Sequence, residues 1–258
     1  MLATAPARPA RSLRRPVEFL SIWLAAAVLI AAPATPAAAQ VTGSLGVQNT
    51  YRLRGYSVSG GHPVATLNLY YDHPSGIYVN LSGLGELDHG ATPEALGYIA
   101  NVGYARRIGP QLSIDGGAVR TQFSHYAVGR NAGAHYTDFY VGIAGRGLSS
   151  HLHYSPDYYR HGASTLYGEI DGALAPAENW QLTGHVGLLG YLDYPASAPG
   201  YRASRQLRYD WRAGIARQLG AFLIHADLSG GGPRGEAAYY RPTARQGTAL
   251  TIGVTWVF

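Results

Sequence analysis

The chain has no cysteine, few charges and almost no long apolar runs. Without cysteine, no disulfide bond can hold the fold. Charged residues make up 14% of the chain, against roughly 25% in typical soluble domains. The one apolar run, residues 19–32, is shorter than the roughly 20 residues that a membrane-spanning helix needs. These absences exclude a helical membrane protein and disfavour a soluble domain, whereas they suit membrane-spanning strands with alternating apolar and polar residues.

Lysine is absent as well, so all 20 basic residues are arginine. Four of these arginines, but only one of the 15 acidic residues, lie before residue 41, so the remainder carries 16 arginines against 14 acids. This near balance gives no reason to expect a nucleic-acid partner.

The first 39 residues have the layout of a cleaved signal peptide. Arginines within residues 8–15 form a basic region, residues 19–32 form the apolar region, and Ala37, Ala38 and Ala39 supply a small-residue cleavage site. We predict that residues 1–39 are removed and that residues 40–258 form the secreted domain, beginning at Gln40.

From residue 41 onward the dominant period is two, which is typical of strands with one apolar and one polar face. It runs through residues 41–54, 66–71 and 77–82, and continues near 96–105, 111–121, 136–145, 149–156, 164–174, 180–190, 207–217, 221–229 and 248–258. Most of these segments are long enough for a tilted strand to cross a bilayer. The pattern predicts an all-β transmembrane antiparallel up-and-down β-barrel of about 12 strands. Alternation breaks near 118–123 and 149–156, where we expect bulges or shifted boundaries.

The links between the predicted strands alternate in length. Short links fall near 72–76, 106–110, 146–148, 176–179 and 218–220, and long links near 57–63, 86–95, 122–135, 157–163, 191–206 and 230–247. Outer-membrane barrels have short periplasmic turns and longer external loops. The alternation therefore predicts that both chain ends lie in the periplasm.

The last predicted strand carries apolar residues on one face and ends at the aromatic Phe258. A terminal aromatic residue resembles the signal by which the outer-membrane assembly machinery recognises its clients. We therefore expect this machinery and outer-membrane lipid as partners, and the cell outer membrane as the location. Tyrosines near strand ends suit the aromatic girdles of such barrels. These are Tyr51, Tyr71, Tyr98, Tyr104 and Tyr209.

The opposite strand face is polar and would line the interior. A barrel of about 12 strands lies between small barrels filled by side chains and wide porins. Interior charges either pair in a lattice that fills the lumen or line a narrow passage and set its selectivity, and the sequence leaves both open. In an open lumen the arginines would concentrate anions. The lumen-lining candidates are Arg52, Arg54, Asn68, Tyr78, Asn80, Asp115, Asp138, Tyr140, Glu169, Asp171, Arg208, Asp210, Arg212 and Asp227.

No motif indicates catalysis or a metal site. Five of the ten histidines fall in or near predicted external loops, and no set matches a zinc-ligand spacing. Ser124 and His125 are adjacent, and on a strand their side chains would point opposite ways. We therefore predict no catalytic residue, no metal and no cofactor.

The most specific motif is residues 49–59, with the sequence NTYRLRGYSVS. It resembles the opening motif of the TorF family of porins, also catalogued as the Gcw_chp family of unknown function. Tyr51, Arg54, Gly55, Ser57 and Ser59 match that motif, whereas position 50 has threonine in place of the family's aspartate. The resemblance implies an outer-membrane barrel with a porin role, and it supplies no substrate or catalytic residues.

The sequence favours passive passage of small polar solutes as the function, and the chain is not expected to be an enzyme. A closed structural or surface-interaction barrel is the second hypothesis, and an outer-membrane hydrolase is the third.

Overall fold

The structure, a computed structural model, describes residues 40–87, 93–124, 134–159, 161–193, 207–232 and 247–258. The predicted signal peptide lies outside these residues. The strands are β1 (Gln40–Gln48), β2 (Arg52–Leu53), β3 (Tyr56–Ser57), β4 (Val64–Asp72), β5 (Ile77–Glu86), β6 (Glu94–Gly109), β7 (Leu112–Phe123), β8 (Ala134–Gly145), β9 (Leu148–Ser155), β10 (Thr165–Ala177), β11 (Trp180–Tyr191), β12 (Arg208–Leu219), β13 (Phe222–Gly232) and β14 (Ala249–Val257).

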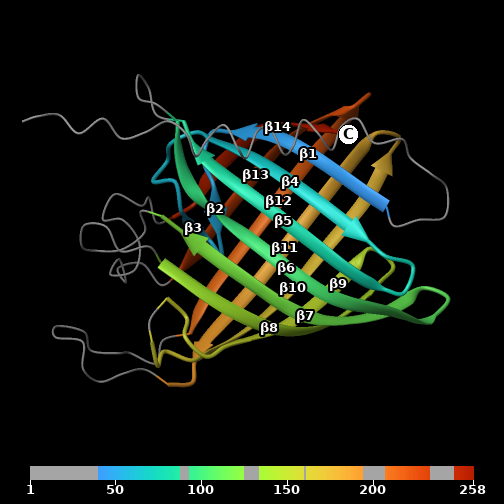
Figure 1. Cartoon of the computed structure of the whole chain (residues 1–258). Helices are drawn as coiled ribbons and strands as arrows, with labels where there is room; N and C mark the ends of the chain where they lie inside the picture. Colours follow the sequence, from blue (N-terminus) through green and yellow to red (C-terminus); the bar gives the residue numbers. More distant parts are fainter. Residues whose placement is uncertain (1–39, 88–92, 125–133, 160, 194–206, 233–246) are drawn as a thin grey trace, which may run out of the picture. The chain divides into compact units, whose positions relative to one another are not determined.

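Twelve of these strands form one closed barrel (Figure 1). Each strand pairs antiparallel with its neighbour in sequence, apart from β2 and β3, which form a separate two-stranded sheet. The barrel closes where β1 pairs with β14, from Ser44 opposite Val257 to Gln48 opposite Gly253. The predicted fold class and strand number are confirmed. Among the described residues, no helix has the length and apolar character needed to cross a membrane.

Short links join β4 to β5, β6 to β7, β8 to β9, β10 to β11 and β12 to β13, and they gather at the right-hand end of the barrel in Figure 1. The β8–β9 link consists of Arg146 and Gly147, with φ angles of 52° and 78°. Two positive φ values match a type I′ turn, which follows the twist of paired strands. The longer links lie between the other consecutive barrel strands, as the sequence predicts.

The outer surface of the barrel is apolar. Large side chains such as Val79 and Ile252 are 39% and 51% exposed, as expected of a face that meets lipid. Tyr71, Tyr98, Tyr104 and Tyr209 are also exposed on strands, in agreement with an aromatic girdle. Tyr51 is not, because it follows the end of β1 and packs against a buried cluster inside the barrel.

No bulge lies near 118–123 or 149–156, since β7 and β9 keep an unbroken register there with both neighbours. The boundaries are shifted, as the other expectation had it: β7 continues to Phe123 and β9 spans Leu148–Ser155. Register shifts occur instead at Leu84/Gly85, Arg107/Gly109 and Leu174/Ala177. Each of these shifts lies close to a strand end, where bulges commonly terminate regular pairing.

The two faces can be told apart by substitution. Val79→Arg should lower the free energy of unfolding by about 2–4 kcal/mol if position 79 lies near the bilayer midplane. Asn80→Arg, one residue further on the opposite face of β5, should cost much less because a charge there meets the polar interior. Urea unfolding of the barrel in liposomes measures both changes. Equal costs would contradict the assignment of the two faces.

Candidate functional site

The link between β1 and β4 contains a hairpin that folds into the barrel; we call residues 49–59 the inserted hairpin. Its strands β2 and β3 pair Arg52 with Ser57 and Leu53 with Tyr56. The turn between them has φ angles of 46° at Arg54 and 78° at Gly55, again matching a type I′ turn. The alternation at residues 41–54 had placed Arg52 and Arg54 on the first barrel strand. That placement is wrong, because β1 ends at Gln48.

Hydroxyl groups hold the base of the inserted hairpin. The Thr50 hydroxyl lies 3.1 Å from that of Ser57 and 3.3 Å from that of Ser59. The Ser59 hydroxyl also accepts the backbone N–H of Tyr51 at 3.1 Å. All three hydroxyl-bearing residues are buried, so these bonds satisfy groups that would otherwise be costly to remove from water. Burial raises the pKa of the Tyr51 phenol to about 12, which keeps it neutral.

Apolar contacts dock one side of the inserted hairpin onto the inner wall. Tyr56 and Val58 join a buried cluster with Val64 of β4, Leu84 of β5 and Phe123 of β7. These wall residues lie toward the strand ends that lead into long links. The inserted hairpin therefore fills part of the lumen at that end of the barrel.

The turn of the inserted hairpin reaches the wall formed by β12 and β13. A Cβ atom placed on Gly55 would lie 2.8 Å from Cβ of Asp210 and 3.0 Å from Cα of Gly231, closer than side chains can pack. Only glycine at position 55 allows this approach, in addition to the positive φ. The Arg52 guanidinium adds a hydrogen bond of 2.8 Å to the backbone oxygen of Gly247, just before β14.

Arg54 anchors the turn to β8 and β10, further round the inner wall. Its Nη2 atom lies 2.6 Å from Oδ2 of Asp138, with side chains only 11% and 4% exposed. The guanidinium carbon lies 4.1 Å from the ring centroid of Tyr167, 5.3 Å from that of Tyr158 and 5.5 Å from that of Tyr136. Aromatic faces attract cations at these distances. Burial raises the pKa of Tyr158, which lies outside the strands, so its ring stays a neutral phenol beside the arginine.

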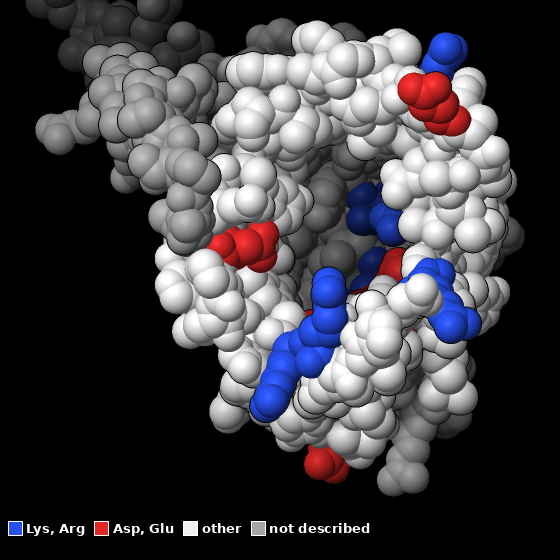
Figure 2. Space-filling model, turned by 90° about the vertical axis from the view of Figure 1, so that its right-hand side faces the viewer, with Lys and Arg blue, Asp and Glu red and all other residues white. Residues whose placement is uncertain are grey.

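A cavity of about 480 Å³ lies beside the inserted hairpin, lined by the hairpin and by inward-facing wall residues. Seen from the end with the short links, the barrel is hollow and carries basic and acidic side chains inside (Figure 2). The ionisable residues that line the cavity, apart from tyrosine, are Arg52, Arg54, Asp138, His153, Glu169, Asp171, His185, Asp210, Arg212, His225 and Asp227. The cavity therefore has five carboxylates against three guanidinium groups, an excess of two negative charges when the histidines are neutral.

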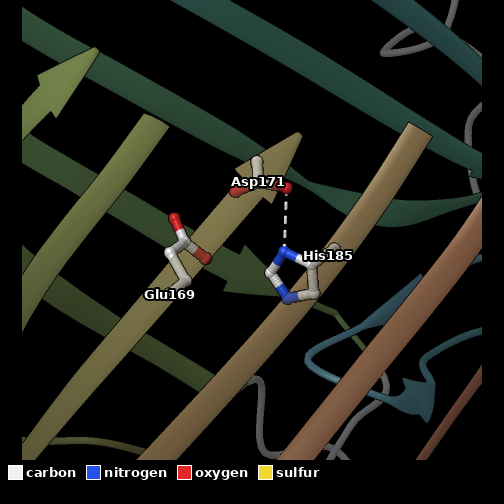
Figure 3. Close-up of side chains that lie close together, drawn as sticks. All are labelled: Glu169, Asp171 and His185. Carbon is white, nitrogen blue, oxygen red and sulfur yellow. Dashed lines mark hydrogen bonds and ion pairs between the residues drawn. The ribbon is translucent and has the colours of Figure 1, made fainter. Parts of the chain in front are cut away.

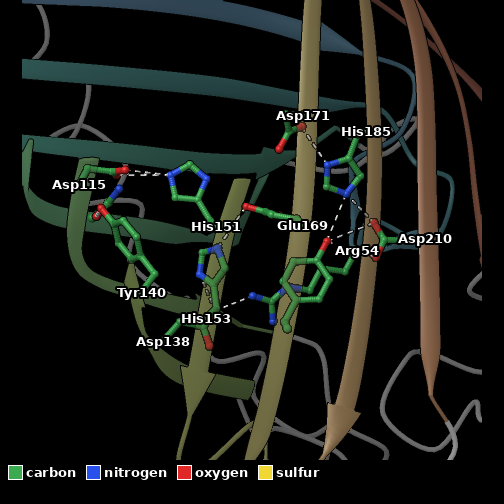
Figure 4. A network of polar contacts seen from close by, with 12 residues as sticks. Arg54, Asp115, Asp138, Tyr140, His151, His153, Glu169, Asp171, His185 and Asp210 are labelled. Atoms are coloured by element: carbon green, nitrogen blue, oxygen red, sulfur yellow. Dashed lines mark hydrogen bonds and ion pairs between the residues drawn. The ribbon is translucent and has the colours of Figure 1, made fainter. Parts of the chain in front are cut away.

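One polar network in the cavity joins β10, β11 and β12 (Figures 3 and 4). His185 has its Nδ1 atom 2.8 Å from Oδ1 of Asp171 and its Nε2 atom 2.8 Å from Oδ1 of Asp210. The Tyr167 hydroxyl donates to Asp210 at 3.2 Å. On β9, His153 lies 3.1 Å from Glu169.

A second network lies on β5 to β9, further toward the short links (Figure 4). Tyr78 donates its hydroxyl to Asp115 at 2.9 Å and also contacts the hydroxyl of Tyr140. The Nε2 atom of His151 lies 3.3 Å from Asp115. A Cβ atom at Gly103 would lie within 3 Å of both tyrosines, so this wall position has to be small.

Eight of the 14 predicted lumen residues line the cavity: Arg52, Arg54, Asp138, Glu169, Asp171, Asp210, Arg212 and Asp227. Tyr78, Asp115 and Tyr140 belong to the second network. Asn68 donates to the Ser44 hydroxyl at 3.1 Å, Asn80 is half-buried, and Arg208 is buried with its guanidinium 5.6 Å from the rings of Tyr56 and Tyr191.

The sequence-based candidates left out residues that the structure places at the site. These are the cavity histidines His153, His185 and His225 and the tyrosines around Arg54. His185, His225 and Tyr167 occupy alternating positions on the polar face of their strands, which is the signal in the sequence that could have found them. Their contacts could not be inferred, because each joins residues on different strands.

A closed antiparallel barrel with an apolar outer surface and a charged interior is the fold class of outer-membrane β-barrels. A family model described as "Bacterial protein of unknown function (Gcw_chp)" matches residues 31–230, and the chain therefore belongs to this family.

Solved structures are similar to this chain at low sequence identity, and the NanC porin among them shows the same fold. A NanC porin is 12% identical with a TM-score of 0.51, and the match covers 84% of this chain and 99% of that one. A KdgM porin is 11% identical with a TM-score of 0.49, and the match covers 84% of this chain and 99% of that one. An outer membrane channel from Pseudomonas putida F1 is 11% identical with a TM-score of 0.45, covering 87% of this chain and 97% of that one. The comparison with curated proteins finds no match.

Proposed function

We propose that this protein is an outer-membrane porin for small polar solutes, with the cavity as its passage and the inserted hairpin as its constriction. The observation that carries this proposal is the charged cavity beside the inserted hairpin, in a barrel that is hollow at the other end. The resemblance of residues 49–59 to the opening motif of the TorF porins supports the same role. The proposal therefore includes that this chain is a TorF porin. The role involves no catalysis.

The charge of the cavity favours cations over anions. The expectation that arginines would concentrate anions depended on Arg52 and Arg54 lying free on a wall. Arg54 instead pairs with Asp138 and Arg52 binds backbone oxygens. Over the whole cavity, five carboxylates face three guanidinium groups, so a surplus of negative charge remains even if His185 carries a second proton. A surplus of negative charge in a confined passage attracts cations.

A closed structural barrel remains the second candidate, because the buried Arg54–Asp138 pair is the kind of contact that holds a plug in place. Conductance in planar lipid bilayers separates the two functions. A porin gives discrete current steps, whereas a closed barrel stays silent although correctly folded.

Reversal potentials test the charge of the passage. In a KCl gradient the wild-type barrel should prefer K⁺. Arg212→Glu, on the inner face of β12, should increase that preference because it adds two negative charges to the cavity. Arg217→Glu is the matched control: it changes the same charge on the same strand, but its guanidinium packs on the Trp180 ring at 5.1 Å, on the outer face. A shift of equal size in both variants would show that the cavity is not the passage.

A further inference from the structure

The strongest candidate for an additional site is a cluster of potential metal ligands on the inner wall. Glu169 and Asp171 lie two residues apart on the inner face of β10, and Asp171 is directly opposite His185 of β11. One ligand atom from each of the three residues lies within 4.8 Å of the other two (Figure 3). Strand pairing therefore brings together a nitrogen and two oxygen donors that lie far apart in sequence.

Both ring nitrogens of His185 have carboxylate partners, an arrangement that resembles the surroundings of metal-binding histidines. Its Nδ1 atom faces Asp171, while its Nε2 atom lies 2.8 Å from Asp210. Asp210 in turn accepts the Tyr167 hydroxyl, and its side chain is 6% exposed. Histidine ligands commonly donate their second ring N–H to a carboxylate, which fixes the ring and makes the other nitrogen a better ligand.

The contacts of His185 also call for an additional positive charge. A neutral imidazole has one N–H, yet both ring nitrogens lie 2.8 Å from carboxylate oxygens, which only accept hydrogen bonds. Either a second proton or a metal ion must therefore lie between His185 and one of the carboxylates. The Nδ1 atom faces Asp171, and Glu169 offers a carboxylate oxygen within 4.8 Å of a ligand atom of each of these two residues, so an ion beside Asp171 gains a further ligand.

The net charge around Glu169, Asp171 and His185 is negative enough to be balanced by a divalent cation. Glu169, Asp171 and Asp210 bring three negative charges, and the cation nearest to Asp171 is Arg212, at 3.8 Å with a half-exposed side chain. Arg54 faces the same region, but Asp138 offsets its charge. The Nε2 atom of His153 also lies 3.1 Å from Oε1 of Glu169 and can donate a hydrogen bond to it as a neutral imidazole, so the ion would share this carboxylate with His153. A divalent ion would balance the remaining charge.

We propose that Glu169, Asp171 and His185 bind a divalent transition-metal ion of the zinc class. Such ions accept imidazole nitrogen together with carboxylate oxygen, whereas Mg²⁺ and Ca²⁺ prefer oxygen ligands only. Tetrahedral ligands at about 2.1 Å from the metal lie about 3.4 Å apart. The 2.8 Å contact between His185 and Asp171 would open slightly and Glu169 would close in, both by side-chain movement. The fourth position faces the cavity and would hold water.

Titration of the purified, untagged barrel in detergent with ZnCl₂ tests the proposal, and Co²⁺ absorption in the visible range reports the coordination geometry. One Zn²⁺ should bind per barrel at pH 7.5, and Co²⁺ should give a tetrahedral spectrum. His185→Gln and Glu169→Gln should each weaken binding at least tenfold. His225→Gln is the matched control, because His225 also faces the cavity and lies 2.7 Å from the carboxylate of Asp227, but contacts no second carboxylate among the described residues. Its Zn²⁺ affinity should match wild type.

Three results would overturn the proposal: no Zn²⁺ binding at pH 7.5, unchanged affinity in Glu169→Gln, or equal affinity for MgCl₂. The first would mean that a proton supplies the charge beside His185. If His185→Gln fails to fold, as judged by circular dichroism and heat-dependent gel mobility, Glu169→Gln decides alone, because it leaves the hydrogen bonds of His185 in place. The titration does not depend on conduction, so the proposal can hold or fail independently of the porin function.

Discussion

Removing the inserted hairpin should raise the single-channel conductance several-fold. The inserted hairpin lies in the lumen and lines the cavity, so it occupies cross-section that ions would otherwise use. The register offers a clean deletion, because Gln48 of β1 lies directly opposite Val64 of β4. Replacing residues 49–63 by Asn-Gly creates a two-residue link of the kind that favours a type I′ turn and keeps both strands in register. Planar-bilayer recordings before and after the deletion measure the effect.

The absence of native cysteine provides an independent control for this result. Leu53→Cys places one thiol on the inserted hairpin beside the cavity, and a bulky charged thiol reagent should reduce the current of this variant. Val79→Cys, on the outer face of β5, should leave the current unchanged under the same treatment. If the deletion conducts no better than wild type and the Leu53→Cys current is insensitive, the inserted hairpin is not the constriction.

The barrel could be predicted because its signals are local. Alternation with a period of two shows which side chains face lipid, and a short link needs only a few residues to reverse the chain. The inserted hairpin was missed because alternation continues through Arg52 and Arg54, so the period alone gives no strand end. A signal was present in Arg54-Gly55, since glycine favours the positive φ of a type I′ turn.

The interior contacts could be predicted only in part. Period two correctly separates the inner wall from the outer one, but which residues meet across the wall depends on the register between strands. Asp171 and His185 meet because β10 and β11 pair at that position, and a shift of one residue would turn one of them to the lipid. Tyr51 was predicted in the girdle for the same reason that Arg54 was misplaced: both belong to a segment that leaves the wall.

Breaking the anchor of the inserted hairpin should have the largest effect on stability. Arg54→Ala leaves the Asp138 carboxylate buried without its partner, and losing one member of a buried pair costs about 3–5 kcal/mol. The contacts of the guanidinium with three tyrosine rings are lost as well. Urea unfolding should show this loss, and the freed turn should also increase the conductance.

Two comparison variants test whether burial of the Arg54–Asp138 pair causes the loss of stability. Arg212→Ala removes a partly exposed pair with Asp171 at 3.8 Å, so its cost should stay below about 1 kcal/mol. The double variant Arg54→Met with Asp138→Leu removes both buried charges together, and apolar replacements of similar size often restore stability. This double variant should therefore unfold closer to wild type than Arg54→Ala does, while its inserted hairpin has lost the charged anchor. Equal losses in Arg54→Ala and Arg212→Ala would mean that the pair with Asp138 is solvated and that apolar packing alone holds the inserted hairpin in the lumen.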